Sequence, residues 1–374
     1  MSYIDLSGYI DDELLYIAPS GQDLRLSKCQ KSLLGNNVNQ QSIKNNIEIY
    51  SFKIIVIHLD AYCISSVSTD WLPNNIQQVL LLGDTHHGLE PLTRLVRWLK
   101  SSSILRIVNY ACPHHDELIY KSTGIECIYF PAIFAIRKWI KPCTSIQKKV
   151  VTHLGNVSAN HIRRKKLLKA LVFSGAPIEC LTIYGDPMLN ALNESLAIVN
   201  CSLNNDMAHR VAESLAAGTL LFTDRMTNYH KFAEYLQNEG MIMSYKRNNP
   251  SSLQEQLQEL VDKSMSLFGG KEILQQKNTA FSKFKLFIQR FNLYQLLSDY
   301  IRLQPVVLPE LLDPEMSCLT TIEIQKNLHF YEEAMEEHRR DKALEFNAKW
   351  KHRLETDYVL RNLKQIISRF TIGH

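Results

Sequence analysis

The sequence lacks the long apolar runs of an integral membrane protein. No stretch approaches the roughly 20 consecutive apolar residues that a helix needs to cross a bilayer. The first residues, MSYIDLSGYIDDELLYIAP, carry acids where a secretory signal peptide carries bases, and they lack its apolar centre. We therefore expect a cytoplasmic protein with no transmembrane segment.

Paired cysteines are also missing. The eight cysteines lie singly along the chain, and no two of them have the C-x-x-C spacing of a zinc ribbon or a redox motif. Several lie among apolar, strand-forming residues, where cysteine packs as a small hydrophobic side chain. This pattern favours a reducing compartment and indicates no disulfide framework.

The chain carries little excess charge of either sign. It has 42 Lys and Arg against 38 Asp and Glu, a net charge of +4. Such a balance does not indicate a nucleic-acid partner, although it does not repel an anionic ligand. With 45% hydrophobic and 21% charged residues, the composition is that of an ordinary globular protein. A length of 374 residues predicts two domains and an appendage.

Short apolar runs alternate with helical segments through most of the chain. The predicted strands lie at 52–58, 78–83, 105–109, 127–130, 149–154, 178–184, 197–200 and 219–223. The predicted helices lie at 91–101, 162–173, 229–240, 251–267 and 276–303. This alternation predicts an α/β fold with parallel sheets. We expect two Rossmann-like domains whose loops after the strands face a common cleft, with a C-terminal helical extension.

The two series of strands are separated by a linker-like stretch, Ile140–Ser145. We expect an N-terminal Rossmann-like domain at 1–145 and a second Rossmann-like domain at 146–275. A crossover helix region at 276–304 and a helical tail at 305–374 are expected to follow. The tail is rich in charge and poor in strand formers, so two interpretations stay open: an oligomerisation or partner-binding element, or a simple packing appendage.

The most informative stretch is Ala197–Asp224, which is predicted to form a strand, a loop, a helix and a second strand. The first turn of the helix carries His209 and Arg210, and a helix N-terminus is a common site for anions. Glu213 follows among apolar residues, where an acid is rare without a partner. It is predicted either to bind a ribose diol or to pair with Arg210 at i, i+3.

Polar loops follow two strands of the first half, Asp84–Gly88 and Tyr110–Asp116. Their imidazoles belong to His86, His87, His114 and His115. Three interpretations are open: exposed caps, ligands of a zinc or iron ion together with the two aspartates, or an acid, base or donor to a substrate hydroxyl. A likeness of the first loop to metallophosphoesterases is not supported, because the further motifs of that class are missing.

Basic and small residues follow the strands of the second half. Gly155 and Asn156 form a turn before a helix whose start carries Arg163 and Arg164, and Gly185 follows the next strand. The basic run 161–166 is either a solvated helix face or a set of cations within reach of a phosphate. It is too short and too local to form a nucleic-acid surface.

The stretch from Asn200 to Gly218, with Thr223 and Asp224 after it, resembles a motif of glycosyltransferases with the GT-B fold. Its R-x-x-E-(A/S)-L-A-(A/S)-G core is matched from Arg210 to Gly218. The likeness is to CgeB-like sequences and to glycosyltransferase families of the 1 and 4 type. It is good over 149–226, weak over 79–131 and absent from the tail.

The resemblance implies a hexosyltransferase-type enzyme that takes a UDP- or GDP-sugar as its substrate, with no tightly bound cofactor and no metal. The donor would be bound mainly by the second half, where Glu213 would hold the ribose hydroxyls. The donor-binding residues are then expected to be Gly155, Asn156, Arg163, Arg164, Gly185, Ser202, Asn204, Asn205, His209, Arg210 and Glu213. The first half would bind an acceptor, either a saccharide, a peptide or a small molecule. Asp84, His86 and His87 would supply its base or an orienting donor.

The sequence departs from the family pattern at three positions. Retaining relatives carry E-x7-E, and the position of the first acid is Asn205 here. The Arg of their G-R turn is replaced by Asn156, and the residue nearest to their next Lys is His161. The stereochemical outcome therefore stays open. A non-catalytic nucleotide-binding protein and a sugar-nucleotide epimerase are the alternative functions.

Overall fold

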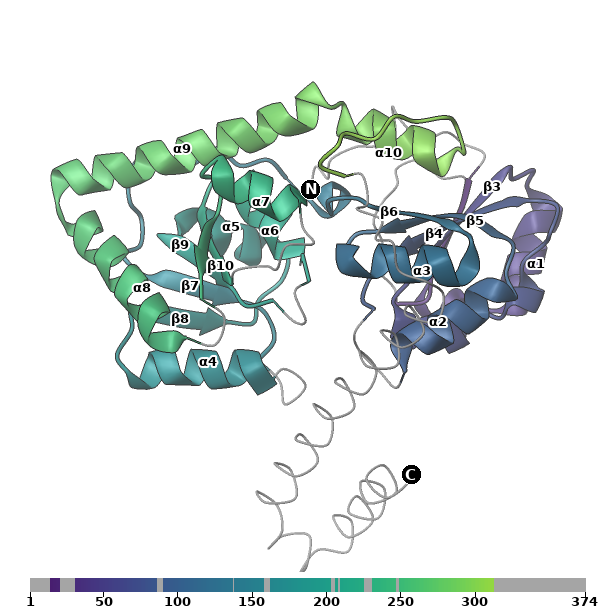
Figure 1. Cartoon of the computed structure of the whole chain (residues 1–374), viewed down its shortest axis with the longest axis horizontal. Helices are drawn as coiled ribbons and strands as arrows, with labels where there is room; N and C mark the ends of the chain where they lie inside the picture. Colours follow the sequence, from purple (N-terminus) through teal and green to yellow (C-terminus); the bar gives the residue numbers. More distant parts are fainter. Residues whose placement is uncertain are drawn as a thin grey trace, which may run out of the picture.

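The computed structural model describes residues 14–20, 31–85, 90–136, 138–157, 162–202, 206–207, 209–224, 231–246 and 249–312. These residues form two α/β domains, each built on its own parallel sheet, with a long helix running along the second domain and a shorter one over the first (Figure 1). The two Rossmann-like domains expected from the alternation of strands and helices are confirmed.

The first sheet has six parallel strands in the order β2-β1-β3-β4-β5-β6. The strands are β1 (Leu14–Ala18), β2 (Lys31–Leu34), β3 (Ile54–Leu59), β4 (Gln77–Leu82), β5 (Ile104–Asn109) and β6 (Glu126–Tyr129). Its helices are α1 (Gln40–Ile49), α2 (Pro91–Lys100) and α3 (Asp116–Thr123). Short 3-10 turns lie at Gly35–Asn37, Ala61–Ser66, Thr69–Trp71, Pro113–His115 and Ile133–Ala135. Alternate residues of the central strands belong to two different apolar cores, so both faces of this sheet are covered.

The second sheet has five parallel strands in the order β11-β10-β9-β7-β8. The strands are β7 (Val151–Leu154), β8 (Ile178–Leu181), β9 (Ala197–Asn200), β10 (Leu220–Asp224) and β11 (Met243–Tyr245). The helices are α4 (Ile162–Phe173), α5 (Asp186–Glu194), α6 (His209–Ala216), α7 (Lys231–Asn238) and α8 (Pro250–Met265). Because all the pairs are parallel, the loops after β7, β9 and β10 meet at one edge of the sheet.

The helical segment expected at 276–303 is two helices, α9 (Leu267–Arg290) and α10 (Leu293–Ile301). α9 starts at Leu267, earlier than expected. The sequence did not predict this start because Gly269 lies in the first turn, and glycine disfavours helix interiors. A Cβ at this position would overlap with the backbone oxygen of Lys263, so the turn from α8 into α9 requires glycine there. The break before α10 falls at Asn292, which has a left-handed φ of 46°.

The two halves are joined by α10, by the linker and by apolar packing. Arg106 on β5 donates to the backbone oxygens of Tyr300 and Gln304, and its guanidinium lies 4.6 Å from the Tyr300 ring. In the linker, the backbone N–H of Ile140 donates to the backbone oxygen of Ala216 at the end of α6. One apolar core continues through both halves. The end of α6 is therefore held by the linker as well as by its own domain.

No helix in the described ranges is long and apolar enough to cross a membrane. The expected helical tail lies outside these ranges except for residues 305–312, which form no helix. The domain limits at 145, 275 and 304 stay predictions.

Candidate functional site

A buried carboxylate organises the loop ends of the second sheet. Asp224, the last residue of β10, accepts hydrogen bonds from the backbone N–H of Ser202 at 2.8 Å and from its hydroxyl at 2.7 Å. The Arg163 guanidinium donates to the same carboxylate at 2.6 Å and also to the backbone oxygen of Ser202. Asp224 is fully buried, so its charge requires these donors. Two residues expected to bind the donor, Ser202 and Arg163, thus have structural partners.

A second arginine bridges the loops after β7 and β9. Arg164 donates to the backbone oxygen of Cys201 at 3.1 Å and to that of Asn156 at 3.1 Å. Gly155, between β7 and this loop, has a φ of 150°, which disfavours any side chain. A Cβ placed on Gly155 would lie 3.6 Å from Nε2 of His153 and 4.0 Å from Nη1 of Arg164. Sequence reasoning therefore located the turn correctly and missed the histidine beneath it.

His153 is a neutral acceptor at this edge of the sheet. His153 is 2% exposed, and burial, aided by the charges of Arg164 and Arg210 and opposed by the hydrogen bond to Val199, lowers its pKa to about 4. Nδ1 lies 2.9 Å from the backbone oxygen of Val199, so the single ring proton resides on Nδ1. Nε2 is buried and has no hydrogen-bond partner among the residues that the structure describes. A ligand hydroxyl or N–H group is the kind of donor that this nitrogen can accept.

The helix α6 carries a cation and an acid on one face. The Arg210 guanidinium lies 2.9 Å from the carboxylate of Glu213 and 3.0 Å from the sulfur of Met188. Both side chains of the ion pair are mostly buried, and within the described part of the chain Nε of Arg210 has no hydrogen-bond partner. The i, i+3 pairing expected as one alternative is therefore present. The charge of Arg210, like that of Arg164, lowers the pKa of His153.

The remaining predicted residues of the second half are placed as follows. Gly185 lies at the start of α5 with a φ of 68°. Asn156 is exposed next to Gly155. The positions of Asn204 and Asn205 lie outside the described residues, so the departure at Asn205 has no structural account. The helix α5 was not expected. Its first two residues, Asp186 and Pro187, had been interpreted together with Gly185 as a loop.

In the first half, Asp60 anchors the described part of the loop that was expected to face the acceptor. Sequence reasoning missed this residue. Asp60 follows β3 and is 4% exposed. Its carboxylate accepts from the backbone N–H of Asp84 at 2.8 Å and from the Tyr62 hydroxyl at 3.0 Å. Asp84 itself is half-buried after β4. The predicted residues His86 and His87 lie outside the described residues.

A buried chain of aromatic hydroxyls and imidazole crosses the first sheet. The Tyr16 hydroxyl lies 2.7 Å from Nδ1 of His58, and Nε2 of His58 lies 2.5 Å from the hydroxyl of Tyr110. Tyr110 then contacts His209 of α6, with the ring centroids 5.0 Å apart. These partners are far apart in sequence. The one signal that the sequence offered was a polar side chain within each of two otherwise apolar strands, Tyr16 in β1 and His58 in β3.

The loop Tyr110–Asp116 does not form a metal site in the described residues, which hold no group of three or more His, Cys, Asp or Glu suited to a metal. Nδ1 of His115 is 2.6 Å from the Thr85 hydroxyl. Asp116 accepts from the side-chain N–H of Asn109 at 2.6 Å, and its other carboxylate oxygen is buried with no partner in the described ranges. Burial raises the pKa of Asp116 from its usual 3.8 to about 8.

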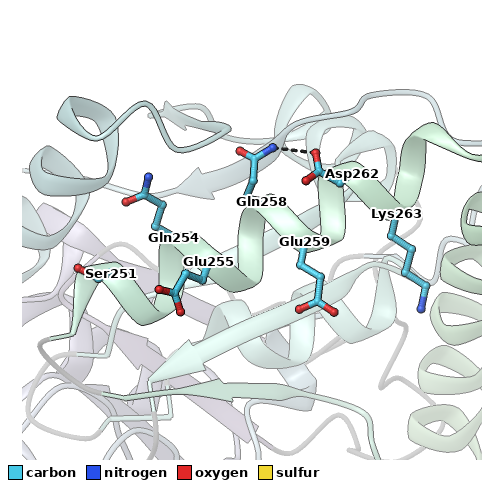
Figure 2. A pocket seen from close by; sticks show the side chains of 7 residues that line it. All are labelled: Ser251, Gln254, Glu255, Gln258, Glu259, Asp262 and Lys263. Atoms are coloured by element: carbon cyan, nitrogen blue, oxygen red, sulfur yellow. Dashed lines mark hydrogen bonds between the residues drawn. The ribbon is translucent and has the colours of Figure 1, made fainter.

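The described residues also form two hollows. A shallow depression of about 800 Å³ lies on the outer face of α8 (Figure 2). It is lined by Ser251, Gln254, Glu255, Gln258, Glu259, Asp262 and Lys263. Three acids against one lysine make this surface unsuitable for an anion. A cavity between the halves, next to Met207 and Phe232, measures about 10 Å³, at the lower limit of what holds one water.

No protein-family model matches the chain, and no curated protein matches it. Among solved structures, it is similar to a glycosyltransferase from Rickettsia africae, with 13% identity over 78% of this chain and 99% of that one, at a TM-score of 0.46. A sucrose-phosphate synthase from Thermosynechococcus elongatus is 9% identical over 69% of this chain and 77% of that one, at 0.48.

The structure of TarM is also similar, with 10% identity and a TM-score of 0.44 over 64% of this chain. The aligned part spans about half of TarM, 54% of its length.

We predict that Arg163 and Arg164 differ sharply in their effect on stability. Arg163→Ala leaves the buried Asp224 without its cation, which we expect to lower the free energy of unfolding by about 3 kcal/mol. Arg164→Ala removes donors to backbone oxygens only, at about 1 kcal/mol. Denaturant unfolding measures both values. Equal losses for the two variants would contradict the structural role of Arg163.

We predict that stability falls as the pH rises because of Asp116. Its pKa is about 8 when folded and near 3.8 when unfolded, so the folded state retains a proton that the unfolded state has lost. The stabilisation is full below about pH 4 and is lost as the pH rises toward 8. Asp116→Asn, a neutral mimic, should remove most of this dependence between pH 5 and pH 8.5 in denaturant unfolding. An unchanged pH dependence would show that Asp116 ionises normally.

Proposed function

We propose that this chain is a GT-B glycosyltransferase that transfers a hexose from a UDP- or GDP-sugar to an acceptor, without a bound metal, in the cytoplasm. The single observation that carries the proposal is the cluster beneath Gly155, where the buried Nε2 of His153 and the Arg164 guanidinium lie beside the same glycine and the charge of Arg210 on α6 is close enough to lower the pKa of His153. This is the edge of a parallel α/β sheet where ligands bind.

The donor diphosphate is proposed to lie between Arg164 and the N-terminus of α6. Arg164 contributes a fixed positive charge, and the first turn of a helix contributes free N–H groups and a positive dipole end. Charge that develops on the departing diphosphate is stabilised by the same groups, so the reaction needs no metal ion. A contact between Arg163 and the phosphate remains a prediction, because the Arg163 guanidinium already donates to Asp224 and Ser202.

Glu213 is proposed to accept hydrogen bonds from the ribose hydroxyls. Its carboxylate is mostly buried, and Arg210 orients it through the 2.9 Å ion pair. A fixed carboxylate that accepts from a diol needs no reorganisation when the nucleotide enters. The free Nε2 of His153 supplies a further acceptor next to Gly155 for a donor group of the nucleotide-sugar.

The acceptor is proposed to bind to the first half, 1–145, with the donor on the second, 146–275. Asp84 is placed after β4 by the hydrogen bond from its backbone N–H to Asp60. From there its carboxylate, with His86 or His87, is proposed to take the proton of an acceptor hydroxyl. The acceptor is a saccharide, a peptide or a small molecule, and the tail 305–374 is proposed to mediate self-association.

We predict that the folded protein binds UDP or GDP and that two substitutions weaken this binding. Arg164→Ala removes a charge-assisted contact, which corresponds to a loss of about 10-fold or more in affinity. Glu213→Ala removes the ribose acceptor, with a loss of similar size. Titration calorimetry with each nucleotide measures both effects, and release of sugar from UDP- and GDP-hexoses in the presence of EDTA measures metal-independent turnover.

Lys271→Ala is the matched control, because it removes an exposed positive charge from α9, a helix that supplies none of the proposed donor-binding residues. It should bind nucleotide as the unchanged protein does. Unaltered affinity in a folded Glu213→Ala variant would contradict the ribose role. Nucleotide binding without turnover of any sugar donor would favour a non-catalytic protein, and a changed sugar without an acceptor would favour an epimerase.

A further inference from the structure

Two successive residues of the first half hold the start of α6. The backbone oxygen of Ala111 accepts from the backbone N–H of Met207 at 2.7 Å. The ring of the preceding residue, Tyr110, packs against His209, with the planes inclined by 37° and the centroids 5.0 Å apart. A backbone hydrogen bond fixes the position of the chain before α6, and a ring contact fixes the orientation of its first turn.

Tyr110 is itself held rigidly. Its hydroxyl is bonded to His58, its ring meets Phe134 edge-on with centroids 5.0 Å apart, and it is 2% exposed. The absence of a side chain at Gly83 makes this possible, because a Cβ there would overlap with the Tyr110 hydroxyl and with the carboxylate of Asp60. Tyr110 is therefore a fixed surface against which His209 rests.

His58 links this surface to the centre of the first sheet. Burial lowers its pKa to about 4, although Asp60 acts in the opposite direction. The neutral ring has one N–H and one acceptor nitrogen, so it donates to one phenol and accepts from the other, bridging Tyr16 and Tyr110. No charge changes in this bridge near neutral pH, so its effect is geometric.

We propose that Tyr110 is a positioning residue for nucleotide binding, acting through His209 on the helix that carries Arg210 and Glu213. This inference rests on the proposed function. The ring contact fixes the rotation of α6 and hence the direction in which the Arg210 and Glu213 side chains project from it. A site that is fixed before the ligand enters binds it more tightly, because less ordering accompanies binding. The first half thus contributes to donor affinity without touching the nucleotide.

A double-mutant cycle on nucleotide affinity tests this directly. Tyr110→Leu, His209→Leu and the double variant are titrated with UDP and with GDP in the calorimeter. Each single change should weaken binding by about 5-fold, and the double variant should bind no more weakly than the singles, because both remove the same contact. Unchanged affinity in the single variants, or losses that multiply in the double variant, would overturn the inference.

Tyr235→Leu is the matched control. It removes a ring contact of similar geometry, with Tyr235 and Phe287 centroids 5.2 Å apart, between α7 and α9. It should lower the melting temperature and leave nucleotide affinity unchanged, whereas a purely structural role of Tyr110 would make its variant behave in the same way. If Tyr110→Leu does not fold, Tyr110→Met, which fills the same space in the core without a ring, takes its place in the cycle with His209→Leu.

The outcomes separate the two proposals. Binding of neither UDP nor GDP by the unchanged protein would contradict the proposed function and this inference together. Binding that is lost in Arg164→Ala and unaffected in Tyr110→Leu and His209→Leu would contradict the positioning role alone.

Discussion

The buried charge of Asp224 is the constraint on which the arrangement of the second half depends. A carboxylate without solvent must be matched by donors, and the donors here come from the loop after β9 and from α4. Satisfying this one group therefore brings together the ends of β9 and β10 and the start of α4. Arg164, one residue from Arg163, is thereby turned toward Gly155 and the loop after β7.

The two halves form a continuous body at the start of α6. The apolar core runs through both, and the space beside Met207 barely admits a water molecule. Tyr110 and Ala111 extend this contact to the helix that carries Arg210 and Glu213. The geometry of the proposed nucleotide site accordingly depends on both halves, and changes in the core of the first half should alter it.

Local patterns could be predicted from the sequence, and distant pairings could not. The strand Ala197–Asn200, the helix that starts at His209 and the ion pair of Arg210 with Glu213 follow from periodicity and i, i+3 spacing. The partner of Arg163 lies 61 residues away, and His58 joins residues 42 and 52 positions distant. α9 was placed too late because glycine lowers helix propensity, while close packing at Gly269 requires it.

Hydrogen–deuterium exchange with and without UDP or GDP tests the central claim most directly. If the nucleotide binds at the ends of β7 and β9, peptides covering 151–157 and 209–216 exchange more slowly when it is present, and the outer face of α8 at 251–263 is unaffected. Binding with no protection at 151–157 and 209–216, or with protection confined to 251–263, would contradict the assignment of the site.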